Sequence, residues 1–179
     1  LLFKWQGRNA ESQPVMFYAH QDVVPVESED GEGWKFPPFS GEIAEGFVWG
    51  RGALDTKSLI ICMMEAADRL IAVGFQPSST IYIALGHDEE VGGNWGAARI
   101  ARALRERDIR LDWVLDEGLG VIDGAFKDSD PPIALVAMAE KGHANIELRV
   151  KGGGGHSAAP PFETVIGTLA LALDRLAKN

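Results

Sequence analysis

The sequence predicts an α/β fold with a mostly parallel sheet flanked by helices, followed by the start of a second, α+β domain. Two observations predict it. Apolar runs of strand length alternate with amphipathic helical stretches between residues 14 and 117, an order typical of a parallel sheet covered on both faces. After Pro131-Pro132, apolar residues instead alternate singly with polar ones, which indicates strands with one solvated face.

The first domain is assigned to residues 1–140, and its elements follow from apolar spacing and turn residues. The runs "PVMFYAH" and "STIYIALG" predict buried strands, and short alternating runs around Ala44-Glu45-Gly46 predict a hairpin. The expected elements are a strand over 14–20, a hairpin over 40–52, a helix from Asp55 or Thr56 to Val73, a strand over 79–86, a helix over 93–107 and a strand over 111–117.

Residues 141–179 are expected to be the first strand and helix of the second domain, truncated. Segments 132–142 and 143–152 both resemble strands, and in the second Ile146, Leu148 and Val150 alternate with polar residues. The run "GGGGHSAAPP" then leads into a helix expected over 162–177, which is apolar on one side.

Composition excludes several classes of partner. The 179 residues carry a net charge of −9, which argues against nucleic acid and anionic membrane surfaces because both require a basic face. No segment approaches the roughly 18 apolar residues of a membrane span. The single cysteine, Cys62, forms no internal disulfide, and the chain lacks an initiator methionine. The compartment is therefore unknown.

Acidic residues and one histidine follow the predicted parallel strands. His20 ends the first strand, Glu89 and Glu90 follow the second, Asp116 and Glu117 end the third, and Asp55 precedes a helix. Carboxyl ends of parallel strands line the ligand crevice of an open α/β sheet. Mixed nitrogen and oxygen donors suit zinc, whereas oxygen donors alone suit magnesium or calcium. We therefore expect a metal centre at this edge.

Spacing within the motifs suggests a division of roles. His20 and Asp22 lie two residues apart and face the same way on an extended backbone, so the Asp22 carboxylate can orient the imidazole. Glu89 and Glu90 are adjacent and point differently. One of them can therefore bind metal while the other takes a proton from water.

Five motifs in order resemble the aminoacylase and carboxypeptidase S family of di-zinc metallopeptidases: "AHQDVVP", "GRGALDTK", "GHDEEVGG", "LDEG" and "GGGGHSAAPP". The resemblance runs from about Val15 to the end of the chain. The stretches "GHDEEVGGNWGA" and "EKGHANIELRVKGGGGHSAAPP" are most similar to the carboxypeptidase S branch.

The resemblance implies a ligand set for two zinc ions, with cobalt or manganese as substitutes. His20 and Glu117 would bind the first ion, Glu90 the second, and Asp55 would bridge both across a cis peptide to Thr56. In this family another histidine ligand and the residues that bind the substrate carboxylate lie further downstream. The fragment alone is therefore expected to be inactive.

The resemblance also implies the catalytic roles. Glu89 would be the general base and Asp22 the partner of His20. His156 would come from the second domain, a lid through which relatives dimerise, and would stabilise the oxyanion in the neighbouring subunit. The expected reaction is zinc-dependent hydrolysis of an amide or peptide bond adjacent to a free carboxylate, in a small peptide or an N-acyl amino acid, by a homodimer when full length.

Simpler interpretations stay open for single residues. The acids after residue 86 resemble a solvated loop, Asp55 could cap its helix, and His156 could be an ordinary loop histidine. Glu117 is preferred over Asp116 as the ligand only by the match to "LDEG".

Two alternative functions also remain. A serine hydrolase would use Ser157, although Ala159 stands where the G-x-S-x-G elbow needs its last glycine. A non-catalytic metal-binding relative would serve as a binding or scaffold domain, but Glu89 would then have no role. A phosphate loop is disfavoured, because no lysine follows the glycine run.

Overall fold

The computed structural model describes the chain except residues 28–32, 119, 125–126, 128–130, 140, 157 and 179. Ser157 therefore lies outside the described residues. The chain divides into two compact units, Leu1–Val136 and Ala137–Asn179. The elements of the first unit are β1 (Leu2–Trp5), β2 (Val15–His20), β3 (Glu42–Ala44), β4 (Phe47–Trp49), α1 (Ser58–Ala72), β5 (Ile81–Gly86), α2 (Ala97–Glu106), β6 (Val114–Leu115), β7 (Val121–Ile122) and β8 (Ile133–Ala134).

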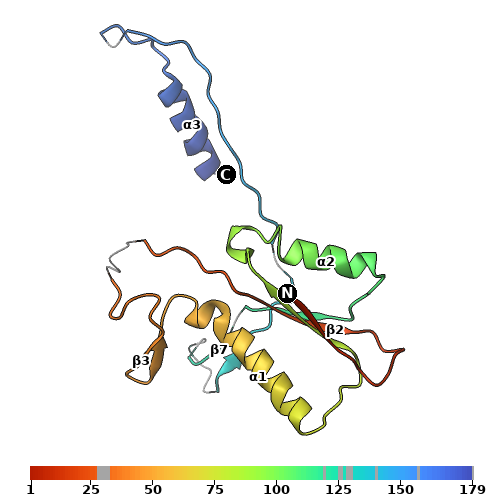
Figure 1. Cartoon of the computed structure of the whole chain (residues 1–179). Coiled ribbons are helices and arrows are strands. Elements are labelled where there is room, and N and C mark those ends of the chain that lie inside the picture. The colour runs from red at the N-terminus through yellow and green to blue at the C-terminus, as the bar shows by residue number, and fades with distance from the viewer. Residues whose placement is uncertain are drawn as a thin grey trace. The chain divides into compact units, whose positions relative to one another are not determined.

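A four-stranded sheet in the order β1-β5-β2-β6 forms the centre of the first unit (Figure 1). β2 pairs in parallel with both β5 and β6, and β1 runs antiparallel to β5. The predicted, mostly parallel sheet is thus confirmed. β1 carries no strand signal in the sequence because it is short and two of its four residues are exposed.

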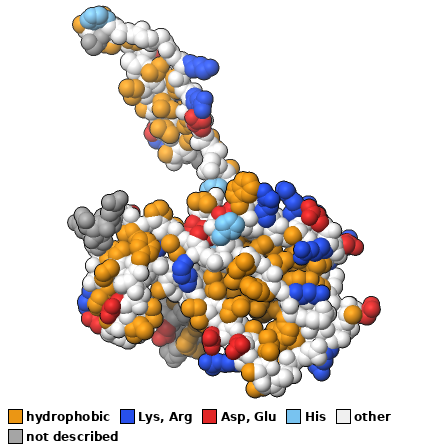
Figure 2. Space-filling view, in the orientation of Figure 1, with side chains coloured by type: hydrophobic (Ala, Val, Ile, Leu, Met, Phe, Trp, Pro, Cys, Tyr) orange, Lys and Arg blue, Asp and Glu red, His pale blue; other side chains and the backbone are white. Residues whose placement is uncertain are grey.

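Helices cover both faces of this sheet, with α1 and α2 on opposite sides (Figure 1). Successive side chains of a strand point to opposite faces, so Ala19 of β2 packs toward α1 and Tyr18 packs toward α2. The α2 side also contains Met16, Tyr82, Ala84, Ile100 and Leu104. The arginines of α2 stay exposed, and Figure 2 shows basic side chains gathered over this helix.

Two predicted elements are shortened by four or more residues in the structure. The helix expected over 93–107 begins at Ala97, because Gly92 and Gly93 have positive φ angles of 101° and 66° and form a turn instead. The strand expected over 111–117 is reduced to Val114–Leu115. The hairpin is confirmed as β3 and β4, which pair antiparallel.

The second unit contains α3 (Val165–Ala177), which begins after Thr164, whose hydroxyl accepts a hydrogen bond from the Gly167 N–H at 3.0 Å. The helical prediction for this region is confirmed, with a later start than residue 162. Segment 143–152 forms no strand, and among the described residues of segment 132–142 only β8 pairs, with β7. Alternating polarity favours a strand, but a strand also needs a hydrogen-bonding neighbour, and the described residues provide none for 143–152.

No helix among the described residues has the length and apolar character needed to cross a bilayer.

Gly86 ends β5 at a point of close approach. A Cβ atom at this position would lie 2.0 Å from the hydroxyl oxygen of Tyr18, and real atoms do not approach so closely. Gly86 is also paired in register with His20. The absence of a side chain therefore lets the Tyr18 ring reach the carboxyl end of the sheet.

We expect Gly86→Ala to destabilise the protein by about 1–3 kcal/mol, the usual cost of overpacking a buried site. Denaturant unfolding measures this. Gly120→Ala is the matched control, because a Cβ there meets nothing within 4 Å, and adding Tyr18→Phe to Gly86→Ala should recover part of the loss. Equal stability of Gly86→Ala and the parent would contradict the close approach.

Candidate metal centre

Four segments of the first unit bring ionisable side chains to the carboxyl edge of the sheet. His20 is the last residue of β2, Glu89 and Glu90 lie in the short 3-10 turn Glu89–Val91 after β5, and Glu117 follows β6. Asp55 lies in an irregular turn, Ala53–Lys57, before α1. The sequence prediction that these residues gather at one edge is therefore met by the structure.

His20 is the centre of the cluster, and its side chain is fully buried. Its Nε2 atom lies 3.0 Å from Glu117 Oε1, 3.1 Å from Asp55 Oδ1 and 3.8 Å from Glu89 Oε2. Two sets of possible ligand atoms lie within 4.8 Å of one another: His20 with Asp55 and Glu117, and His20 with Glu89 and Glu90. One imidazole nitrogen thus faces carboxylates from three other segments.

The opposite nitrogen of His20, Nδ1, contacts Asp22, but mainly through the backbone carbonyl of Asp22 and not through the carboxylate that the sequence predicts. Nδ1 lies 3.0 Å from the backbone carbonyl oxygen of Asp22 and 3.4 Å from its carboxylate. Donation from Nδ1–H to the carbonyl leaves the Nε2 lone pair directed at the acids. The carboxylate of Asp22 instead accepts the backbone N–H of Glu90 at 3.0 Å, which joins the end of β2 to the acidic turn.

Two carboxylates of the cluster, Glu89 and Glu117, have raised pKa values. Burial raises the pKa of Glu117 above its usual 4.5; His20 opposes this, and the charges of Asp55, Asp116 and Glu89 add to it. Burial likewise raises the pKa of Glu89, with His20 again opposing. Among the described residues, the ion pairs of Glu89 and Glu117 are with His20 and not with a lysine or arginine.

The pKa of His20 is raised and the pKa of Asp22 is lowered, so both changes favour the charged form of the side chain. Burial lowers the pKa of His20, but Glu117, the Asp22 carbonyl and Glu89 together outweigh burial and raise it above 6.5. Burial raises the pKa of Asp22, but the backbone N–H groups of Glu90 and Glu89 outweigh it and bring the value below 3.8. Neighbouring groups therefore favour the charged form of both side chains despite their burial.

Asp55 faces His20 and does not cap the following helix. α1 begins after Lys57 without any side-chain cap, so the interpretation of Asp55 or Thr56 as its N-cap is wrong. The peptide between Asp55 and Thr56 is cis, as the family resemblance implies.

Asp88 has a structural function that the sequence did not reveal. It is 7% exposed, and its two carboxylate oxygens accept the backbone N–H groups of Trp95 at 2.6 Å and Gly96 at 2.7 Å. The first of the three consecutive acids therefore shapes the loop into α2. No sequence signal distinguishes it from Glu89 and Glu90.

Asp116 and Glu117 also differ in position. The Asp116 carboxylate accepts the N–H of Glu117 at 2.8 Å, while the Glu117 carboxylate reaches His20. Of the two carboxylates, that of Glu117 is the one placed beside His20 Nε2, and its role as a ligand stays a prediction.

His156 belongs to the second unit, whereas the cluster around His20 belongs to the first. It is exposed, and its Nδ1 accepts the N–H of Ala158 at 3.2 Å. Its expected catalytic role stays a prediction, as does any role of Ser157.

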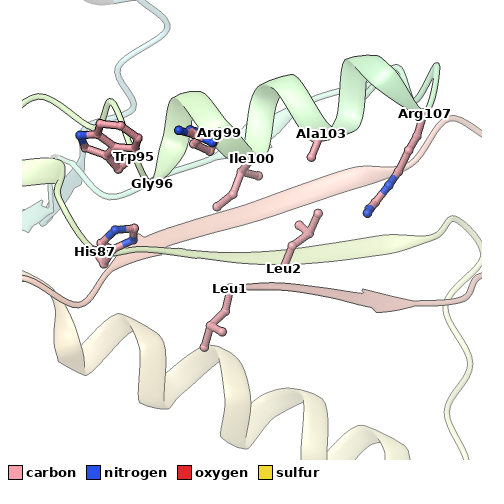
Figure 3. Close-up of a pocket in the computed structure, with 9 residues that line it drawn as sticks. All are labelled: Leu1, Leu2, His87, Trp95, Gly96, Arg99, Ile100, Ala103 and Arg107. Atoms are coloured by element: carbon pink, nitrogen blue, oxygen red, sulfur yellow. The ribbon is translucent and has the colours of Figure 1, made fainter.

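His87 lies outside the ligand cluster although it precedes the acids. It lines a pocket of about 330 Å³ with residues of β1 and α2, and Figure 3 shows it near Trp95 and Gly96. The guanidinium carbon of Arg99 is 4.6 Å from the centre of the Trp95 ring.

The donor set of the cluster fits a divalent cation. One imidazole and several carboxylates converge, and an imidazole with carboxylate oxygens is a common set for zinc. Burial, and after it the repulsion between neighbouring carboxylates, raises the pKa values of Glu89 and Glu117, and a bound cation would favour their charged forms against both effects.

Known proteins resemble the chain over almost its whole length. The family described as "Peptidase family M20/M25/M40" matches residues 16–178. The N-fatty-acyl-amino acid synthase/hydrolase PM20D1 of Xenopus tropicalis is 44% identical over 178 residues, covering 99% of this chain and 34% of that protein. Carboxypeptidase S of Saccharomyces cerevisiae is 44% identical over 171 residues, covering 93% of this chain and 29% of that protein.

A solved structure has the same fold. Human carnosine dipeptidase 1 superposes with a TM-score of 0.56 at 23% identity, over 68% of this chain and 26% of that one. This chain spans about a third of the length of the curated relatives it matches.

The ordered motifs, the mostly parallel sheet and the match over residues 16–178 agree, and the chain belongs to peptidase family M20/M25/M40.

Proposed function

We propose that the protein containing this chain is a zinc-dependent hydrolase that cleaves an amide or peptide bond adjacent to a free carboxylate. The observation that carries the proposal is the convergence of carboxylates from three segments on the Nε2 atom of the buried His20. A zinc ion bound there supplies Lewis-acid polarisation of the substrate carbonyl and lowers the pKa of a coordinated water.

The proposed ligands of two zinc ions are His20, Asp55, Glu90 and Glu117, with Asp55 shared between the ions. Support comes from the two overlapping sets of possible ligand atoms, which have His20 in common. The Asp22 carbonyl holds the imidazole so that Nε2 faces the carboxylates. The Asp22 carboxylate also accepts a hydrogen bond from the backbone N–H of Glu90. Asp22 therefore orients two proposed ligands, His20 and Glu90.

Glu89 is proposed to take the proton from the attacking water and return it to the departing amine. It lies beside the proposed ligands, with its Oε2 3.8 Å from His20 Nε2. Its raised pKa makes it a stronger base than an ordinary glutamate, closer to the value that suits proton transfer near neutral pH. This position favours a hydrolase over a scaffold, which would need no base.

The proposed substrates are small peptides and N-acyl amino acids. The names of the two relatives indicate these classes: one is an N-fatty-acyl-amino acid synthase/hydrolase and the other a carboxypeptidase. In both classes the bond to be broken adjoins an amino acid with a free carboxylate. We further propose that residues 141–179 begin a lid domain through which the full-length protein forms a homodimer, and that His156 stabilises the oxyanion.

Glu89→Gln should lower kcat about 10²- to 10⁴-fold, the usual contribution of a general base, without loss of bound zinc. The assay uses the full-length, zinc-loaded protein with N-acyl amino acids and dipeptides. Glu90→Gln is the matched control, because it should lower the zinc content instead. A Glu89→Gln protein as fast as its parent would contradict the base assignment, and a zinc-loaded parent without activity would favour the scaffold interpretation.

Chelation should abolish hydrolysis, and zinc should restore it, whereas a serine-directed phosphonate should have no effect. Residual activity is followed after each treatment of the full-length protein. Inactivation by the phosphonate with insensitivity to chelation would instead favour Ser157 as a nucleophile.

Glu117→Gln should stabilise the metal-free protein at pH 7 while weakening zinc binding at least about 10-fold, the loss expected even for an outer partner. The folded-state pKa of Glu117 is raised above 4.5, so the folded state retains a proton that the unfolded state has lost. Stability therefore falls as pH rises from 4.5 through the raised pKa, and glutamine removes this loss.

Thermal unfolding between pH 4 and pH 7, with and without zinc, measures both effects. The stabilisation of metal-free Glu117→Gln should vanish near pH 4, where the parent carboxyl is protonated. The control is Glu106→Gln, at an exposed position of α2. A metal-free Glu117→Gln protein less stable than its parent at pH 7 would refute the electrostatic argument.

A further inference from the structure

We propose that the pocket between β1 and α2 binds a small carboxylate with an apolar tail, at a site separate from the metal centre. The pocket encloses about 330 Å³, at the lower end of the volumes typical of small-molecule sites. Its lining comes from the start of β1, from His87, and from α2 with the residues that flank this helix (Figure 3). The lining residues include neither a proposed metal ligand nor Glu89.

The walls of the pocket are largely apolar. Ile100 is 9% exposed, and Leu2 packs against the same core cluster. Ala103 lies three residues after Ile100 on α2, so both side chains are on one face of the helix. The indole of Trp95, which is 65% exposed, forms the wall near the start of α2. An aliphatic chain placed against these side chains would bury apolar surface, which favours binding.

The charge of the pocket is opposite to that of the chain. The sequence has 26 acidic and 17 basic side chains, yet none of the residues that line the pocket is acidic and two of them are Arg99 and Arg107. Neither of these arginines has an ion-pair partner among the described residues. An anionic group on the ligand would therefore complement the pocket.

Arg107 is better placed than Arg99 to bind this anionic group. The guanidinium of Arg99 lies over the Trp95 ring, and this end of the pocket is near the Asp88 carboxylate, which accepts the Trp95 N–H and would repel an anion. Arg107 is eight residues further along, about 12 Å at the rise of an α-helix, and Figure 3 shows its side chain extending from the end of α2 toward the strands. Its neighbour Asp108 lines a different pocket.

The ligand would lie along α2, with its carboxylate at Arg107 and its tail directed toward Trp95. A guanidinium presents two parallel N–H donors that match the two oxygens of a carboxylate. A neutral ligand would leave this cation unused, and a small anion would leave the apolar wall uncovered. Free fatty acids and N-acyl amino acids both combine the two features.

The test titrates the full-length, metal-free protein with octanoate and measures the heat of binding. Removing zinc prevents octanoate from binding to the metal, and the readout does not depend on hydrolysis. We expect one site with a dissociation constant on the order of 1 mM or tighter. Octanamide, which lacks the charge, and acetate, which lacks the tail, should each bind at least about 10-fold more weakly. Equal binding of either compound would overturn the proposal.

Arg107→Gln should weaken octanoate binding at least about 10-fold, the loss expected when a hydrogen bond to a charged group is removed. Arg102→Gln is the matched control, because Arg102 is exposed on the same helix and does not line the pocket. Unchanged affinity in Arg107→Gln would overturn the proposal, as would a larger loss in Arg99→Gln.

A second variant tests the cavity with all arginines retained. Ala103→Leu should weaken octanoate binding by filling the pocket, whereas Ala101→Leu, at an exposed position of α2 that does not line it, should not. Equal affinity in the two variants would show that octanoate is bound by surface charge alone and would overturn the proposal.

N-octanoylglycine distinguishes the two sources of this ligand chemistry, because it has the same carboxylate and tail with an amide between them. Binding tighter than that of octanoate supports an N-acyl amino acid as the ligand, and weaker binding supports a free fatty acid. Arg107→Gln should weaken both. If neither compound binds, this inference is overturned, while an active zinc-loaded parent still supports the hydrolase.

Discussion

The parallel pairing of β2 with β5 on one side and β6 on the other is the constraint on which the site depends. Parallel strands end at the same edge, so residues separated by almost a hundred positions in the chain meet there. His20 ends the central strand and is fully buried. Its position gives the surrounding carboxylates a common point of contact.

The cluster is destabilised by its own charge when no cation is bound. The raised pKa values of Glu89 and Glu117 have a clear cause: burial weakens hydration, and neighbouring carboxylates repel one another. Such a site is maintained by the backbone around it, and its charge is what a divalent cation would neutralise. The same repulsion that lowers the stability of the metal-free protein would thus favour metal binding.

The role of each acidic residue depends on its position as well as on its type. Asp88 binds two backbone N–H groups and shapes the loop, and Asp22 links the end of β2 to the acidic turn. Asp116 supports the backbone of Glu117. Three of the seven carboxylates at this edge therefore organise the backbone around the others, which is why an acid-rich motif need not supply a ligand at every acidic position.

By itself, the sequence determined the order of the parallel strands β2, β5 and β6 with the helices between them, the family and the group of residues at the carboxyl edge. These follow from local patterns: apolar runs for β2 and β5, glycine at the turns, and five motifs in a fixed order. Tertiary structure alone decided that Asp88 is structural, that the Asp22 carbonyl holds His20, and that the Tyr18 hydroxyl lies against Gly86. It also left residues 143–152 without a strand. Each of these depends on which backbone groups lie nearby after folding, and a one-dimensional pattern does not encode that distance.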